Sequence, residues 1–549
     1  MKKLLFIIVL GLLVAMGDAM AQSGTAGNLS WNFDSTTGTL TISGKGEMED
    51  YSNSSPAPWR SYRLAIKQVD IKKGVTSIGT RAFYDCDYII SIALPKGIKS
   101  IGKAAFSNCD RLSSVSLPKS VKRIGENAFV SCERLSSINL PKGIVSIERA
   151  AFGGCHSLTS INLPKGLKSI GREAFRNCRS LTSIVIPKGI TSIEERTFDR
   201  CTSLTSVKLP KGITSIAGNA FAGCEKLTSI NFPAELTQIE EYAFANCSFT
   251  SVVLPKGLKT IGGAAFLNCG SLSSINFPEG LESIGVAAFQ NCSLASVYIP
   301  KGVTKIGEVA FADCNSLTYI SVEEDNANYI SIDGVLFNKT EGVLLQYPPR
   351  KEADLYTVPE GIVRIGNSAF SSCSSLSSIV LPQGLESIGR FAFYYCSSLA
   401  SINIPEGVTS IGDVAFQDCS SLTSIALPEG IEKIGIAAFY RCSSLTSINL
   451  PAGITRIEDS TFRDCSSLAS ITLPEGITSI GRRVFWGCTS LAAITALNPT
   501  PVAINPDVFG EMVKEACTLT VPAQAVEAYK TANVWKEFGR IVGKQGGNS

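Results

Sequence analysis

The 549-residue chain has only one histidine, His156, and no pair of cysteines spaced as Cys-x-x-Cys. A single histidine excludes most Ser-His and Cys-His catalytic designs and any metal site built from several imidazoles. The missing cysteine pairs exclude the usual zinc and redox motifs. No glycine-rich phosphate loop is present. We therefore expect no enzyme, no cofactor and no metal, and we expect His156 to lie in a loop.

The chain also lacks a strong net charge and, after its first residues, any long apolar run. A net charge of +3 gives no global attraction to nucleic acid or to membranes. Residues 1–21 have the pattern of a secretion signal, with basic Lys2 and Lys3, an apolar stretch over 4–16 and the cleavage sequence Ala19-Met20-Ala21. We expect an exported protein without a membrane span, located outside the cell, at its surface or in the periplasm.

What the chain does have is a repeat of about 23 residues. One copy runs from Leu158 through Ile161, Pro164 and Phe175 to Cys178. A fixed period between 20 and 29 residues is typical of a leucine-rich-repeat solenoid. A phenylalanine marks the register of every copy, at Phe83, Phe106, Phe129, Phe152, Phe175, Phe198, Phe221, Phe244, Phe266, Phe289, Phe311, Phe370, Phe393, Phe416, Phe439, Phe462 and Phe485.

Each copy predicts one coil. Ile161 alternates with polar neighbours as in a strand. Pro164 then ends the strand because it has no amide proton to donate. The Ala-Phe-x-x-Cys segment that contains Phe175 fits one short helical or 3-10 turn. One coil cannot enclose a core, so its apolar side chains must be buried by stacking. We predict a mostly β solenoid of about 17 coils.

The repeat also predicts the domain organisation. Residues 22–66 lack it and contain a predicted hairpin around Thr36-Thr37-Gly38. The register breaks once, because Phe311 and Phe370 are 59 residues apart, which is one period plus 36. Asp333-Gly334 is a turn signal within that stretch. The predicted segments are the signal peptide 1–21, an N-terminal β cap 22–66, repeat block 1 at 67–322, a β insertion 323–357, repeat block 2 at 358–496 and a C-terminal α/β cap 497–549.

The cysteines of the repeat are expected to be buried thiols. Seventeen of the eighteen lie three residues after a marker phenylalanine, as Cys178 follows Phe175. Stacking would align them in one column with parallel side chains, whereas a disulfide needs a dihedral angle of ~90°. Free cysteine behaves as a small buried hydrophobic residue.

The pattern Leu-x-x-Ile-x-Leu-Pro-x-Gly-Ile/Leu-x-x-Ile-Gly-x-x-Ala-Phe-x-x-Cys closely resembles the BspA-like, Treponema pallidum-type leucine-rich repeat over residues 67–496. The stretch Asp333–Asn338 resembles an insertion found in that family. The resemblance implies a surface or exported protein of a host-associated bacterium. Some members bind extracellular-matrix proteins and mediate adhesion or coaggregation. The family has no single ligand motif, so the resemblance assigns no binding residue.

Candidate binding residues come from the outward positions that vary between copies. One column lies between the last two apolar strand residues, and a second follows the strand proline. The second column is mostly lysine before the insertion and mostly glutamate after it. Ordinary surface filling and segment duplication are the alternatives to binding. The candidates are Asn139, Asn162, Lys208, Asn231, Asn276, Tyr298, Tyr319, Lys119, Lys142, Lys165, Lys188 and Lys211.

These observations favour a non-catalytic binding protein, an adhesin for an extracellular protein or glycan, present as a monomer and without nucleic-acid partners. A structural spacer of the bacterial envelope is the alternative. An exported enzyme or inhibitor ranks third. The acidic run Glu323-Glu324-Asp325 is interpreted as a solvated loop rather than a cation site, because its spacing does not match a calcium loop.

Overall fold

The structure is a computed structural model that describes residues 22–544. The predicted signal peptide 1–21 and residues 545–549 lie outside the described residues. The chain divides into two compact units at Leu272 and Ser273. They are called unit 1 (residues 22–272) and unit 2 (residues 273–544).

Unit 1 begins with an antiparallel β hairpin. The β2 and β3 strands pair with Trp31 opposite Ile42, which confirms the predicted hairpin, and β1 adds to its outer edge. β3 then pairs in parallel with β5, so the hairpin leads directly into the coils. The elements of this end are β1 (Gln22–Ala26), β2 (Leu29–Asp34), β3 (Thr39–Gly44), β4 (Gly46–Glu47), the 3-10 helix η1 (Arg60–Tyr62), β5 (Gln68–Ile71) and β6 (Val75–Ile78).

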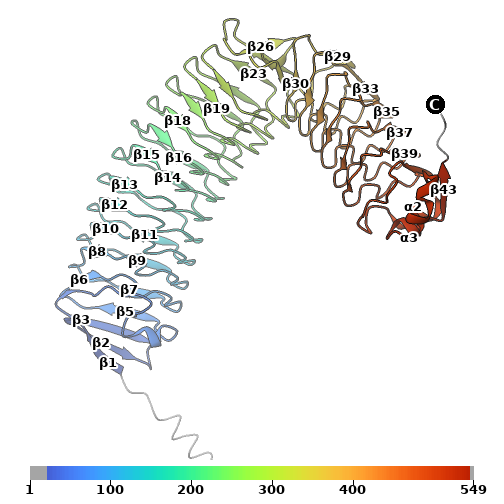
Figure 1. The fold of residues 1–549 in the computed structure, drawn as a ribbon. Helices are drawn as coiled ribbons and strands as arrows, with labels where there is room; N and C mark the ends of the chain where they lie inside the picture. Colours follow the sequence, from blue (N-terminus) through green and yellow to red (C-terminus); the bar gives the residue numbers. More distant parts are fainter. Residues whose placement is uncertain (1–21, 545–549) are drawn as a thin grey trace, which may run out of the picture. The chain divides into compact units, whose positions relative to one another are not determined.

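The coils of unit 1 stack as two columns of short parallel strands (Figure 1). Partners lie one repeat apart, as Ser183 pairs with Ser206 and Ser146 pairs with Ser169. The first column continues as β7 (Ser91–Ala93), β9 (Ser114–Ser116), β11 (Ser137–Asn139), β14 (Ser183–Val185), β16 (Ser206–Lys208) and β19 (Ser251–Val253). The second continues as β8 (Ser100–Ile101), β10 (Arg123–Ile124), β12 (Ser146–Ile147), β13 (Ser169–Ile170), β15 (Ser192–Ile193), β17 (Ser215–Ile216), β18 (Gln238–Ile239) and β20 (Thr260–Ile261).

A third ladder of hydrogen bonds joins the coils at the Ala-Phe-x-x-Cys turn. The N–H groups of Glu173, Phe175 and Asn177 donate to the carbonyls of residues 195, 197 and 199 in the next coil. Glu173 and Asn177 have φ angles of 60° and 59°, in the left-handed region. The intervening amides close 3-10-type turns, since the Cys178 N–H donates to the Phe175 carbonyl. Every second N–H of the turn is thus directed toward the next coil, with left-handed residues at the first and last of these three donors.

The close approach of the coils explains the glycine that ends the second strand. A Cβ atom on Gly171 would lie 2.7 Å from the Arg149 nitrogen of the preceding coil. A side chain at Gly171 would therefore need a local shift of the backbone, whereas the coils with Glu148, Glu194 or Ala217 at the equivalent position keep the same ladder.

The core is a stack of phenylalanine rings. In unit 1 the marker rings are buried and stack in pairs with centroids 5.2–5.6 Å apart. Trp59 ends the stack on Phe83, at 5.8 Å, and its indole N–H donates to the Ala82 carbonyl. Beside the rings runs a column of cysteines, in which Cys178 donates its S–H to the Phe152 carbonyl at 3.2 Å. All eighteen cysteines are free and buried, including the seventeen of the repeat for which this was predicted.

Unit 2 repeats the same two columns. The first column comprises β21 (Ser274–Asn276), β23 (Ser296–Ile299), β25 (Tyr319–Val322), β29 (Leu355–Thr357), β31 (Ser378–Val380), β33 (Ser401–Asn403), β35 (Ser424–Ala426), β37 (Ser447–Asn449), β39 (Ser470–Leu473) and β41 (Ala493–Ala496). The second comprises β22 (Ser283–Ile284), β24 (Lys305–Ile306), β28 (Val343–Gln346), β30 (Arg364–Ile365), β32 (Ser387–Ile388), β34 (Ser410–Ile411), β36 (Lys433–Ile434), β38 (Arg456–Ile457) and β40 (Ser479–Ile480).

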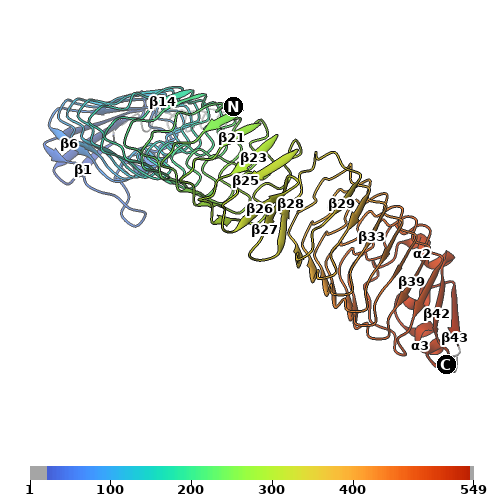
Figure 2. The ribbon, with the colours of Figure 1, turned by 90° about the horizontal axis from the view of Figure 1, so that it is seen from above.

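The predicted insertion forms a second hairpin. The β26 (Tyr329–Ile332) and β27 (Val335–Asn338) strands are antiparallel and joined by Asp333-Gly334, both of which have positive φ angles. β27 also pairs with β28, and Figure 2 shows β26, β27 and β28 side by side. β28 pairs in parallel with β30. Buried Asn326 fixes the start of the hairpin, since its amide donates to the Pro300 and Val303 carbonyls at 3.0 Å.

The described residues form about 21 turns, more than the 17 counted from the phenylalanines. The difference arises because the turns that start at β25, β41, β42 and β43 have no Ala-Phe-x-x-Cys segment in register. β42 and β43 prolong the first column in parallel after β41. The last elements are α2 (Glu511–Ala516), β42 (Thr518–Pro522), η2 (Ala523–Ala525), α3 (Val526–Thr531), η3 (Trp535–Glu537) and β43 (Arg540–Lys544). Within residues 22–544, no helix has the length and apolar character needed to span a bilayer.

Candidate binding surface

The first-column strands present two of every three residues to solvent. In β11, Ile138 points into the core while Ser137 and Asn139 are exposed. This follows from the two-residue period of a strand. The same exposed–buried–exposed pattern recurs in β9, β14, β16, β19, β21, β33, β35 and β37. We call the outward residues of this column the strand face.

Asn139 and Asn162 lie together on the strand face of unit 1. They border an open hollow of about 440 Å³, whose polar lining is completed by the serine hydroxyls of three successive coils. The structure thus brings two of the candidate residues to one concave surface. The complete lining is Ser114, Val115, Ser116, Ser137, Ile138, Asn139, Ser160, Ile161 and Asn162.

Other candidates lie singly on the same face. Lys208 is exposed and pairs in register with Val185, itself 61% exposed. Asn231 is exposed two coils beyond Val185. In unit 2, Asn276 is exposed on β21.

Tyr298 and Tyr319 are neighbours on adjacent strands of unit 2. In the register of β23 and β25, Tyr298 pairs with Ser321 and Ser296 pairs with Tyr319, which makes the two tyrosines diagonal partners. They are 45% and 49% exposed. Exposed aromatic side chains favour interface centres.

Glu323 joins Tyr298 to the loop after the strand. Its carboxylate accepts a hydrogen bond from the Lys301 N–H at 2.8 Å and lies 3.8 Å from the Lys301 ammonium. The Lys301 N–H and the Tyr298 hydroxyl together hold the pKa of Glu323 below its usual range. Partial desolvation, followed by the nearby Glu323 charge, raises the pKa of Tyr298. Glu323 is therefore engaged by protein donors.

The lysines after the strand proline form a separate, exposed edge in unit 1. None of the five candidates in this edge forms an ion pair with a carboxylate in the described part of the chain. Their charges remain available to an acidic partner, and neighbouring coils place them about 5 Å apart. They are Lys119, Lys142, Lys165, Lys188 and Lys211, which we call the lysine edge.

His156 and the cysteines offer no reactive constellation. The His156 Nδ1 atom lies 3.6 Å from a carboxylate oxygen of Glu133, in a partly exposed loop. Burial raises the pKa of thiols such as Cys132 to about 12, so they are protonated at neutral pH. No group of three or more His, Cys, Asp or Glu residues within 22–544 is placed to hold a metal ion.

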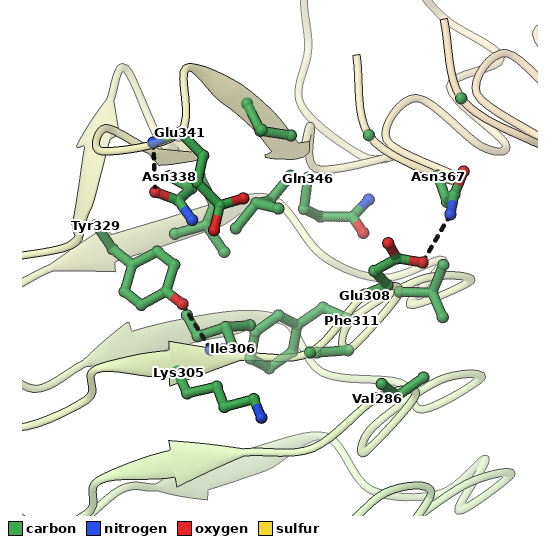
Figure 3. A pocket seen from close by; sticks show the side chains of 18 of the residues that line it. Val286, Lys305, Ile306, Glu308, Phe311, Tyr329, Asn338, Glu341, Gln346 and Asn367 are labelled. Carbon is green, nitrogen blue, oxygen red and sulfur yellow. Dashed lines mark hydrogen bonds between the residues drawn. The ribbon is translucent and has the colours of Figure 1, made fainter. Parts of the chain in front are cut away.

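One polar cavity was not anticipated from the sequence. It has a volume of about 550 Å³ and lies in unit 2 between β24 and β28, beside the insertion (Figure 3). Gln346 and Asn338 line it. The sequence feature that could have indicated the cavity is the short spacing from Leu344 to Tyr347. It is hard to recognise because Tyr347-Pro348-Pro349 replaces the usual Ala-Phe segment.

The fold and surface define a parallel β solenoid of the leucine-rich-repeat class. The sequence matches the family described as "BspA type Leucine rich repeat region (6 copies)" over residues 61–178, 122–249, 237–344, 353–466 and 386–520. These matches cover most of the chain, which belongs to this family. No curated protein matches the sequence.

Several solved structures are similar to the chain. A leucine-rich repeat protein from Bacteroides ovatus is 27% identical over 85% of this chain and 93% of its own, with a TM-score of 0.38. A leucine rich cell surface protein from Faecalibacterium prausnitzii is 25% identical over 87% and 95%, with a TM-score of 0.40. The T. pallidum leucine-rich repeat protein is 30% identical over 36% and 78%, with a TM-score of 0.25. Family membership follows from the repeat match alone.

Proposed function

We propose that this protein is an exported, non-catalytic adhesin, which contacts extracellular proteins or glycans through the strand face and the lysine edge of unit 1. The observation that carries the proposal is the hollow around Asn139 and Asn162, with the unpaired lysine edge on the same coils. Packing requires neither feature, because the core is built by the apolar columns. Stacked lysines oppose folding, since like charges ~5 Å apart repel by ~0.8 kcal/mol even in water.

The test measures capture of the mature chain on immobilised fibronectin, laminin, collagen and heparin at several salt concentrations. Charge complementarity raises association rates and is weakened by salt. We expect saturable binding to at least one of these surfaces. The triple variant Lys142→Glu, Lys165→Glu and Lys188→Glu should weaken it by about tenfold or more.

The matched control reverses three glutamates at equivalent positions in unit 2, as Glu406→Lys, Glu429→Lys and Glu475→Lys. All three are exposed. This variant should bind as well as the parent. Absence of capture by every surface, or an equal response to both triple variants, would refute the lysine edge as a binding surface. Retention on washed cells without ligand capture would favour the spacer role.

A further inference from the structure

The cavity in unit 2 results from a shortened coil. Phe311 lies five positions after Ile306, and Phe370 lies five positions after Ile365, but Tyr347 lies only three positions after Leu344. Tyr347 nevertheless takes the position of a marker ring, since it stacks on Phe370 with centroids 5.1 Å apart.

The missing backbone of the shortened coil leaves the space that Figure 3 shows. Figure 3 places Lys305 and Val286 on one wall and Asn338 and Gln346 opposite them. At about 550 Å³, the volume falls within the ~300–1,000 Å³ typical of small-molecule sites.

The turn ladder stops at this cavity and leaves backbone donors unused. One coil earlier, the Phe289 N–H donates to the Ala310 carbonyl. The equivalent N–H of Phe311, and that of Val309, have no acceptor among the described residues. Both residues line the cavity. Buried backbone N–H groups are almost always paired, so an unpaired pair at a cavity wall indicates a place for an acceptor.

Two buried side-chain amides add further unused groups. Gln346 is 2% exposed and gives its amino group to the Tyr347 carbonyl at 2.9 Å. Asn338 is 8% exposed, and its oxygen accepts from the N–H groups of Thr340 and Glu341. The Gln346 oxygen and the Asn338 amino group have no partner in the described chain. The cavity therefore offers one side-chain acceptor and one side-chain donor, both open to its space, besides the two backbone donors.

The charges at the cavity balance. Lys305 and Arg364 oppose Glu308 and Glu341, all of which line it. Arg364 lies 3.4 Å from Glu341, and Glu308 accepts a hydrogen bond from the Asn367 amide at 2.8 Å. With no excess of either sign, the site suits an uncharged ligand.

The cavity is also bounded at two opposite places. On one side the Ile306 N–H donates to the Tyr329 hydroxyl at 2.6 Å, and on the other Asn367 bonds to Glu308 (Figure 3). An extended polypeptide passing through the cavity would have to break one of these contacts. A compact molecule would not.

We propose that this cavity binds the end of an uncharged oligosaccharide, one or two sugar rings in size. Each sugar hydroxyl can both donate and accept a hydrogen bond, which matches a wall that carries both kinds of unused group. The proposal deepens the proposed function by naming a glycan class, but it concerns a site separate from the strand face and the lysine edge. Either site can therefore fail without the other.

The experiment uses the mature chain and four neutral disaccharides: maltose, lactose, cellobiose and N,N′-diacetylchitobiose. Saturation-transfer NMR detects binding, and isothermal titration gives Kd. We expect at least one to bind saturably. Gln346→Leu should weaken binding of that ligand by about tenfold or more, because it removes the side-chain acceptor of the cavity. Val286→Trp should do the same by filling part of the cavity from a lining position that is 55% exposed, where the fold does not depend on the side chain.

The matched control is Gln383→Leu, an exposed glutamine of unit 2 outside the cavity, which should leave Kd unchanged. The lysine-edge triple variant should also bind the disaccharide normally. Conversely, Gln346→Leu and Val286→Trp should still be captured by the matrix surface. The proposal is overturned if none of the disaccharides binds, or if a bound one is unaffected by Val286→Trp. It is also overturned if a blocked alanine pentapeptide binds and the sugars do not.

Discussion

Unit 1 and unit 2 are built from the same repeat, yet only unit 1 stacks without interruption. Its rings continue from Trp59 to Phe266, each in contact with the next. In unit 2, Phe311 stacks on Phe289, and no ring contact joins it to Tyr347 in the described part of the chain. At this interruption the ring stacking and the hydrogen bonds of the turn ladder are lost, and a polar cavity is present instead. The regular coils of unit 1 thus form a continuous surface, whereas the shortened coil of unit 2 leaves a pocket.

The units also differ in charge at the position after the strand proline. Unit 1 has lysine at six successive coils from Lys96 to Lys211, while unit 2 has glutamate at Glu360, Glu406, Glu429 and Glu475. All of these side chains are exposed. Since packing does not constrain the position, its charge can diverge while the core stays the same.

The largest difference between the units should appear when a marker ring is removed. Phe175 has a stacked ring at 5.5 Å on each side. Among the described residues, Phe311 stacks only on Phe289, and Phe277 lies tilted at 6.5 Å. Phe175→Ala should cost ~3–5 kcal/mol of unfolding free energy because it leaves a void. Phe311→Ala should cost about 1 kcal/mol less, since one aromatic pair contributes ~0.5–1.5 kcal/mol. Urea denaturation gives both values.

Hydrogen exchange supplies the control for the ring variants. Contacts in a solenoid join nearest neighbours, so protection should fall in the coils beside each substitution and persist several coils away. An equal loss of unfolding free energy at both positions would show that the missing ring contact of Phe311 does not affect stability.

A smaller effect per residue, common to both units, should appear at alkaline pH. Burial raises the pKa of Cys132 in unit 1 and of Cys396 in unit 2 to about 12. Between pH ~9 and 12 the unfolded chain loses these protons while the folded chain keeps them. Stability is therefore full below pH ~9 and falls by ~1.4 kcal/mol per pH unit for each thiol. Denaturation midpoints from pH 8 to 10.5 measure this slope.

Cys132→Ala and Cys396→Ala should each make the alkaline slope shallower by the contribution of one thiol. A slope that changes for only one of them would mean that the two cysteine columns are not equally buried. A slope unchanged by both would contradict the burial of protonated thiols.

The smallest effect concerns the charge columns. Lys165 has lysines on both neighbouring coils, whereas Glu429 has Glu406 on one side and Ala452 on the other. Lys165→Gln should stabilise the protein by roughly 0.3–0.8 kcal/mol at low salt, and Glu429→Gln by about half as much. Both gains should vanish near 1 M NaCl, where the screening length falls to ~3 Å. Thermal unfolding at two salt concentrations tests this, and gains that persist in high salt would exclude charge repulsion.

The residues of the core could be predicted because the apolar residues recur at a fixed spacing in the sequence. Ile161, Phe175 and Cys178 recur at fixed spacing, and any side chain that recurs in a stack must meet its own copies. The strand alternation likewise placed Asn139 and Asn162 on the outside. Which outward residues bind a ligand stays a prediction, because no ligand-specific motif accompanies them. The predicted segment limits also remain untested.

The turn ladder and the cavity were not predicted. The left-handed positions accept Asn177, Glu173, Arg196 and Ala150, so no single residue type marks them. The recurrent asparagine before cysteine was the usable signal, since asparagine tolerates this conformation better than most residues. The cavity arises because the coil from Leu344 to Tyr347 is two residues shorter than a regular coil. This shortening becomes apparent only when the coil is compared in space with its neighbours.

Because every coil uses its neighbours in the same way, the number of coils is free to change. Removing 23 consecutive residues from the regular part of unit 1 would join two coils that already present matching rings, carbonyls and N–H groups. Genetic gain or loss of whole repeats should therefore alter reach without altering fold. The 36 extra residues between Phe311 and Phe370 are not a whole number of coils. That mismatch leaves amides without partners, so the largest irregular step in length is also the one that creates a new chemical environment.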